Sequence, residues 1–281
     1  MKITNKNTST ETVDPAYKSL YKIGGLAALV AALIFRRNLD AEYLLLGGLG
    51  IIHTGPTAPP SAVTGWFTLL QQDKLLGLTL LNLFDMVNYA LVGLIFLALC
   101  TALRRSSPSW ITLAAALGFA GVTIYLASNQ ALAMLALSKG YFAATSEAQR
   151  GLILAAGQAL LAIYQDACFT GSGIYLSFLL VSVSGLIIAT AMLKSSTFSR
   201  LTGYMGILAN GFGLAYYLVL AFAKELTFLP LSISAIFLLA WYLLVGGRLW
   251  SLSSNRIPGY LKTGAPSSQE QPNQENYFQT V

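Results

Sequence analysis

The chain has 281 residues, of which 55% are hydrophobic and only 10% are charged. Soluble domains carry about 25% charged residues, so this composition excludes a water-soluble globular protein and favours a helical membrane protein. The net charge of +6 does not indicate a nucleic-acid partner, because the cations are spread between apolar segments and form no single basic patch.

Long apolar runs divide the chain, and a bilayer crossing takes about 20 such residues. The first run has basic residues on both sides and no small-residue cleavage site after it, which favours a retained span over a signal peptide. The predicted spans are Ser19–Phe35, Leu75–Leu103, Trp110–Leu137, Ile174–Leu193, Leu201–Ala223 and Phe228–Trp250. The predicted fold class is therefore all-α, an integral membrane bundle of six transmembrane helices.

Two connecting segments are predicted to lie at the membrane surface. The connection Asn38–Lys74 contains three prolines between residues 53 and 60, which exclude a continuous helix. Within this connection, a short interfacial helix is predicted at Trp66–Leu70. Thr145–Asp166 has a helical pattern but carries several charged and amide side chains. We expect this helix to be interfacial or re-entrant on the outer side and not a seventh span.

The distribution of cations supports this topology. With six spans and both termini in the cytosol, eleven of the 17 lysines and arginines lie on the cytosolic side, as the positive-inside rule requires. If Thr145–Asp166 also spanned the membrane, only seven cations would lie inside.

The sequence predicts a polar, disordered N-terminal segment 1–16, one transmembrane domain 17–252, and a C-terminal tail 253–281 that is mostly disordered.

Polar side chains within the spans indicate where a site could lie. Asp85 is the one ionisable acid or base within the predicted hydrophobic cores, and such residues usually face protein or a wet cavity. On an ideal helix Asn82, Asp85 and Tyr89 fall within about 60° of one another.

Similar stripes occur on two further spans. The third predicted span carries Gly118, Gly121, Tyr125, Ser128 and Asn129, and the fifth carries Gly206, Asn210, Gly213 and Tyr217. We expect these stripes to pack on each other or on the second span. The predicted ligand-binding residues of an outward-facing polar cavity are Asn82, Asp85, Tyr89, Asn129, Asn210 and Tyr217.

The search for catalytic motifs leaves two weak candidates, Asp85 and His53, which could form an acid–base pair at the outer surface. His53 is the only histidine, so a two-histidine zinc motif is excluded, and no metal or other cofactor is predicted. Polar residues in spans also serve simply as contacts between helices, and that interpretation stands beside the functional one.

Several blocks of sequence contain particular residues that a requirement for hydrophobicity alone would not select. They are residues 75–99 (LLGLTLLNLFDMVNYALVGLIFLAL), 128–162, 171–193 and 204–217 (YMGILANGFGLAYY). These blocks resemble a prokaryotic family of multi-pass membrane proteins, the domain-of-unknown-function family 4386, and the resemblance covers roughly residues 75 to 250. It implies a location in a prokaryotic cytoplasmic membrane and no particular activity.

The main hypothesis for function is binding of a lipid or small amphipathic ligand in the outward-facing cavity. The alternatives are an intramembrane enzyme that acts on a lipid, with Asp85 and His53 as the acid–base pair, and a small transporter. No inverted repeat is evident in the sequence, which disfavours the transporter. Membrane lipids are the expected partners, nucleic acid is not, and the sequence does not predict an oligomeric state.

Overall fold

The computed structural model describes residues 15–38, 59–164 and 172–254, and within these ranges it contains helices and no strands. The predicted tails 1–16 and 253–281 therefore lie almost entirely outside the described residues. A 3-10 turn at Pro15–Tyr17 precedes the first helix. The helices are α1 Lys18–Asn38, α2 Val63–Gln72, α3 Lys74–Leu80, α4 Leu83–Leu103, α5 Pro108–Ser128, α6 Ala131–Ala143, α7 Glu147–Tyr164, α8 Gly173–Lys194, α9 Arg200–Phe222, the 3-10 turn η4 Lys224–Leu226 and α10 Phe228–Ser254.

Six long helices form a closed ring in which each packs on two neighbours, in the order α1, α4, α5, α8, α9, α10 and back to α1. Neighbouring helices run in opposite directions. At the start of α1, for example, the Tyr17 hydroxyl accepts a hydrogen bond of 3.2 Å from Arg104 just after the end of α4, and Lys22 lies over the Trp250 ring near the end of α10. The ring therefore brings the ends of distant segments together.

Small residues allow the close approach of α1 to both of its neighbours. A Cβ atom added to Gly24 would lie 2.3 Å from the Cβ of Ala98 on α4 and 3.5 Å from Leu249 on α10. A Cβ added to Gly25 would lie 3.1 Å from the carbonyl oxygen of Gly246 on α10. Backbones this close are typical of helix crossings in membranes, so glycine is required at these positions.

Five helical segments in the described part of the chain are long and apolar enough to cross a membrane. They are α4, α5 together with its continuation α6, α8, α9, and η4 together with α10. The all-α membrane-type fold predicted from the sequence is thus confirmed in its coarse form. Two predicted elements are not among the five: α1, which contains the predicted first span Ser19–Phe35, and α7, which occupies the predicted surface helix at Thr145–Asp166. The predicted number of six spans therefore stays a prediction.

The second and third predicted spans are interrupted. The run Leu75–Leu103 divides at Asn82, whose φ of 63° is the left-handed conformation that asparagine tolerates better than most residues. The run Trp110–Leu137 divides where Asn129 leaves the helix in an extended conformation. Each break shortens a run of 28 or 29 residues to a helix of 21 residues, which is close to one membrane thickness.

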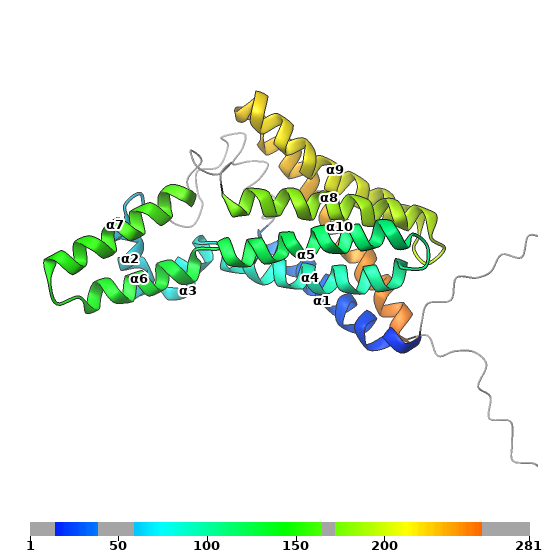
Figure 1. The fold of residues 1–281 in the computed structure, drawn as a ribbon, viewed down its shortest axis with the longest axis horizontal. Coiled ribbons are helices and arrows are strands. Elements are labelled where there is room, and N and C mark those ends of the chain that lie inside the picture. The colour runs from blue at the N-terminus through cyan, green and yellow to red at the C-terminus, as the bar shows by residue number, and fades with distance from the viewer. Residues whose placement is uncertain (1–14, 39–58, 165–171, 255–281) are drawn as a thin grey trace, which may run out of the picture.

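The segments beyond these breaks form a separate group of helices, α2, α3, α6 and α7, at one end of the ring (Figure 1). We call it the cap. Its own apolar core includes Phe67 and Leu70 of α2 and Met134 of α6, all fully buried. The Ser138 hydroxyl also donates a hydrogen bond of 2.9 Å to the Phe67 carbonyl. Trp66, which begins the predicted interfacial helix, is 4% exposed in this core, because α6 and α7 cover α2.

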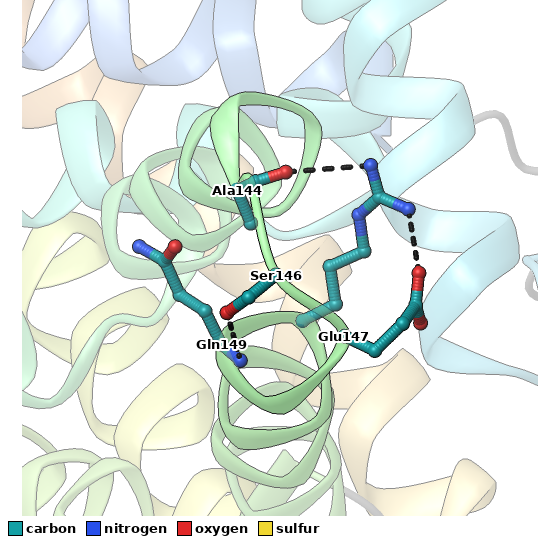
Figure 2. A network of polar contacts seen from close by, with 5 residues as sticks. Ala144, Ser146, Glu147 and Gln149 are labelled. Atoms are coloured by element: carbon teal, nitrogen blue, oxygen red, sulfur yellow. Dashed lines mark hydrogen bonds and ion pairs between the residues drawn. The ribbon is translucent and has the colours of Figure 1, made fainter.

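Polar contacts close the turn between α6 and α7 (Figure 2). The Arg150 guanidinium forms an ion pair of 2.9 Å with Glu147 and donates a hydrogen bond of 3.3 Å to the Ala144 carbonyl. The Ser146 hydroxyl accepts from the Gln149 backbone N–H at 3.3 Å. Both ion-pair side chains are exposed to solvent, so this network shapes the turn and is not a site.

The polar stripes of α5 and α9 do not meet. Both pack on α8, which lies between them in the ring. A Cβ added to Gly118 of α5 would lie 2.7 Å from the Ser184 hydroxyl of α8, and one added to Gly206 of α9 would lie 2.7 Å from Ala189 of α8. The expectation that the two stripes pack on each other was wrong, because helix periodicity identifies a packing face but not its partner. The α5 stripe does pack on the second predicted span, since the Tyr125 ring stacks on Tyr89 of α4.

Candidate functional site

A cavity of about 290 Å³ lies inside the ring and is lined by side chains of α4, α5, α8, α9 and α10. It extends from Asn82 and Asp85, at the end of the ring that bears the cap, to Phe96 and Trp241 deeper in the bundle. Asp85 and Phe96 are eleven residues apart on α4, which corresponds to about 16 Å along the helix axis.

The lining is mostly apolar and strongly aromatic. Seven of its nineteen residues are aromatic, namely Tyr89, Phe96, Tyr125, Phe178, Tyr216, Trp241 and Tyr242. The rings of Tyr89 and Tyr125 stack with centroids 3.7 Å apart and planes within 5°, which fixes both side chains. Among the described residues that line the cavity, Asp85 is the only charged one. It lies in the first turn of α4.

Two buried polar atoms of the lining residues have no hydrogen-bond partner among the described residues. They are the side-chain carbonyl oxygen of Asn88, which is 7% exposed, and the indole N–H of Trp241, which is 1% exposed. An unsatisfied buried polar group costs about 1–3 kcal/mol. Such groups in the wall of a cavity are typical of a site in which a water or ligand atom supplies the missing partner.

The floor of the cavity is closed by the apolar core of the ring. Ile95 and Leu99 of α4, Ile188 and Met192 of α8, and Val245 of α10 are fully buried beyond it. This packing leaves the cavity on the cap side of the bundle.

Four of the six residues predicted to bind a ligand line this cavity, namely Asn82, Asp85, Tyr89 and Asn210. Asn82 does not belong to α4 but to the break before it, because its left-handed backbone ends α3. The Asn210 side chain donates a hydrogen bond of 2.8 Å to the Gly206 carbonyl of its own helix. The binding role of these residues stays a prediction.

The other two predicted residues do not line the cavity and are engaged in structural hydrogen bonds. The Asn129 amide donates to the Asn82 carbonyl at 3.3 Å, and its oxygen accepts from the Ala131 backbone N–H at 3.0 Å. Asn129 therefore joins the two helix breaks. The Tyr217 hydroxyl donates to the Tyr175 carbonyl at 2.7 Å, which ties α9 to the start of α8.

The proposed acid–base pair is only half described, because His53 lies outside the described residues. A catalytic role for Asp85 with His53 therefore stays a prediction from the sequence. Among the residues that the structure describes, no group of three or more histidine, cysteine or acidic side chains could hold a metal ion.

The aromatic and hydroxyl groups contributed by α8 and α10 were missed by the sequence reasoning. They include Trp241 and Tyr242, which lie in the middle of the last apolar run, and the serines Ser182 and Ser234. Tryptophan and tyrosine normally concentrate at the two membrane interfaces. The Trp-Tyr pair at the centre of a predicted span could therefore have indicated an internal cavity.

Comparison of the chain with protein-family models, with curated proteins and with solved structures finds no match. The resemblance of residues 75 to 250 to a prokaryotic membrane-protein family therefore stays a prediction. The cavity and the distribution of charge are the observations on which a function can be argued.

Proposed function

We propose that the chain is a six-span membrane protein that binds a small amphipathic molecule with a cationic end in a cavity open to the outer side. The six spans are the ring helices α1, α4, α5, α8, α9 and α10, and the cap lies on the outer surface. The membrane is the cytoplasmic membrane of a prokaryote, as the family resemblance implies.

The distribution of charge supports this orientation. At the end of the ring opposite the cap, the described residues include seven cations and no acid; the cations are Lys18, Lys22, Arg104, Arg105, Lys194, Arg200 and Arg248. The four described acids, Asp73, Asp85, Glu147 and Glu225, all lie toward the cap. By the positive-inside rule, the end opposite the cap is cytosolic and both termini are in the cytosol.

Site-specific labelling tests the orientation. In a chain whose Cys100 and Cys168 are replaced by serine, Ser196→Cys places a thiol in the α8–α9 turn and Ala148→Cys places one in the cap; both positions are exposed. A membrane-impermeant maleimide added to intact cells should label Ala148→Cys and should reach Ser196→Cys only after permeabilisation. The reverse pattern would exclude the proposed orientation.

The lining of the cavity supports a ligand with a cationic end. The described residues that line it contribute seven aromatic rings and one carboxyl group, and none of them is a lysine or arginine. Aromatic faces attract ammonium groups, with about 0.5–2 kcal/mol per contact, and Asp85 places an acidic side chain at the cap end of the cavity. The apolar depth between Val92 and Leu238 would hold an alkyl or ring portion. The volume favours a small molecule over a two-chain lipid.

Thermal unfolding of the purified full chain tests the ligand class. An alkyltrimethylammonium ion should stabilise the wild-type protein, whereas the alcohol and the sulfonate with the same alkyl chain should not. Replacing Asp85 by asparagine should weaken the effect of the ammonium ion by about tenfold, which corresponds to about 1.4 kcal/mol. Equal stabilisation of the wild-type protein by all three compounds would contradict a cationic preference.

A matched control is available in the cap. Asp73 is also acidic, but it caps α3 by accepting a hydrogen bond of 2.9 Å from the Leu76 backbone N–H and is not part of the cavity. Asparagine is an equally good N-cap, so Asp73→Asn should leave the response to the ammonium ion unchanged. A loss of the same size in both variants would point to a non-specific electrostatic effect.

A further inference from the structure

A second pocket lies at the opposite end of the ring from the cap, between the α8–α9 turn and the last turns of α10. Its volume is about 550 Å³. The polar lining comprises Ser196, Thr197, Ser199, Thr202, Arg248 and Ser251. The apolar part comprises Leu243, Leu244, Phe198 and Gly247. This pocket shares no residue with the central cavity.

Two groups in this pocket are suited to an anion. The Arg248 guanidinium donates one hydrogen bond, from Nε to the Thr197 carbonyl at 2.6 Å, and its two terminal amino groups have no partner among the described residues. Ser199 caps α9, so the positive end of the α9 dipole faces this region. Guanidinium groups and helix N-termini both bind phosphate.

An independent observation also points to a ligand. Thr197 lines the pocket and is 3% exposed, yet its hydroxyl has no hydrogen-bond partner among the described residues. Its backbone carbonyl is held by Arg248 and its backbone N–H by the Ser195 hydroxyl at 3.1 Å. The Thr197 backbone is therefore held beside Arg248, and its side-chain hydroxyl remains available for a further hydrogen bond.

The apolar part of the pocket indicates what carries the phosphate. Leu243 and Leu244 lie about one turn before Arg248 on α10, toward the centre of the bundle, and Leu243 is 50% exposed. On a membrane-spanning helix that exposure faces lipid. We propose that this pocket binds the headgroup phosphate of an anionic phospholipid on the cytosolic face, with an acyl chain along Leu243 and Leu244.

The surrounding charge favours an anionic lipid over a zwitterionic one. This end of the ring bears seven cations and no acid in the described part of the chain, and each cation near the surface contributes about 1 kcal/mol to the attraction of an anionic leaflet. That general attraction needs no pocket. The proposed site adds a single bound lipid whose retention depends on the shape of the pocket.

Gly247 allows the pocket to be filled without disturbing the fold. A Cβ added to Gly247 would meet no atom within 4 Å, and the same is true of Gly211 on α9. Gly247→Leu should therefore fold and occupy the site. Gly211→Leu is the matched control, because Gly211 is not in the pocket.

Native mass spectrometry of the full chain with phosphatidylglycerol or phosphatidylcholine tests the proposal. The wild-type protein and Gly211→Leu should retain one phosphatidylglycerol in preference to phosphatidylcholine. In Gly247→Leu the affinity for phosphatidylglycerol should fall by about tenfold, since a charge-assisted hydrogen bond to phosphate contributes at least that factor. Equal retention by Gly247→Leu and wild type, or equal retention of the two lipids by wild type, would overturn it.

Two further arms make the result specific. Arg248→Lys keeps the positive charge but loses the planar set of guanidinium donors. This variant should therefore retain less phosphatidylglycerol although the surface charge is the same. Unchanged retention would count against the Arg248 contact. Inorganic phosphate and glycerol phosphate should not raise the melting temperature at concentrations at which phosphatidylglycerol does. Stabilisation by free phosphate alone would show a soluble-anion site and overturn the assignment to a lipid. None of these results depends on the central cavity.

Discussion

Leucine in place of Gly24 should prevent the ring of six helices from closing. An added Cβ would lie 2.3 Å from the Cβ of Ala98, and neither of these atoms can move without its helix. Leu249 of α10 lies 3.5 Å away on the other side, so α1 cannot shift toward α10 to relieve the clash. Overpacking a core typically costs about 1–3 kcal/mol, and a leucine that separates two helices should cost at least the upper part of that range.

Thermal unfolding followed by tryptophan fluorescence or by loss of monodisperse protein in detergent measures the effect. The expected result is a strongly lowered melting temperature or no folded protein for Gly24→Leu. Gly211→Leu serves as the control, because a Cβ at this position would meet open space. Its melting temperature should equal that of the wild type. A normal melting temperature for Gly24→Leu would mean that α1 does not pack on α4 as described.

Alanine in place of Phe67 should loosen the cap and leave the ring intact. The Phe67 ring is fully buried, lies 5.4 Å from the Tyr141 ring, and would contact a Cβ added to Gly157 of α7 at 2.8 Å. Removing a buried phenylalanine costs about 3–5 kcal/mol. The cap has a core of its own, separate from the core of the ring, so this loss should remain local.

Hydrogen exchange resolved by peptide separates the two parts. In Phe67→Ala the amides of α2, α6 and α7 should exchange faster, whereas those of α4, α8 and α10 should keep the wild-type rates. Leu152→Ala provides the comparison, because Leu152 lies on α7 but is 74% exposed and should change little. Faster exchange throughout α4, α8 and α10 would show that the cap and the ring unfold as one unit.

The all-α fold class and the position of the apolar segments could be predicted from the sequence. Hydrophobicity and length are local properties, so each run that can span is recognisable without knowledge of its neighbours. Asp85 was also identifiable, because an ionisable residue in such a run is rare. The charge bias between connections indicated an orientation in the same way.

The two helix breaks were decided by tertiary structure. The apolar runs at 75–103 and 110–137 contain no proline and read as continuous helices. Asn82 takes the left-handed conformation and Asn129 ends α5, and the hydrogen bond of 3.3 Å between them holds the two breaks side by side. A contact between residues 47 positions apart leaves no periodic signal in the sequence.

The composition of the cavity was likewise decided by the order of helices in the ring. Periodicity placed Tyr89 and Asn210 on polar faces, but α8 lies between α5 and α9, and Trp241 of α10 reaches the interior. Many ring orders would satisfy the same hydropathy pattern, because lipid is as apolar as leucine and does not select among helix neighbours. Close packing of small residues such as Gly24, Gly118 and Gly206 does select among them, and that complementarity exists only between surfaces in three dimensions.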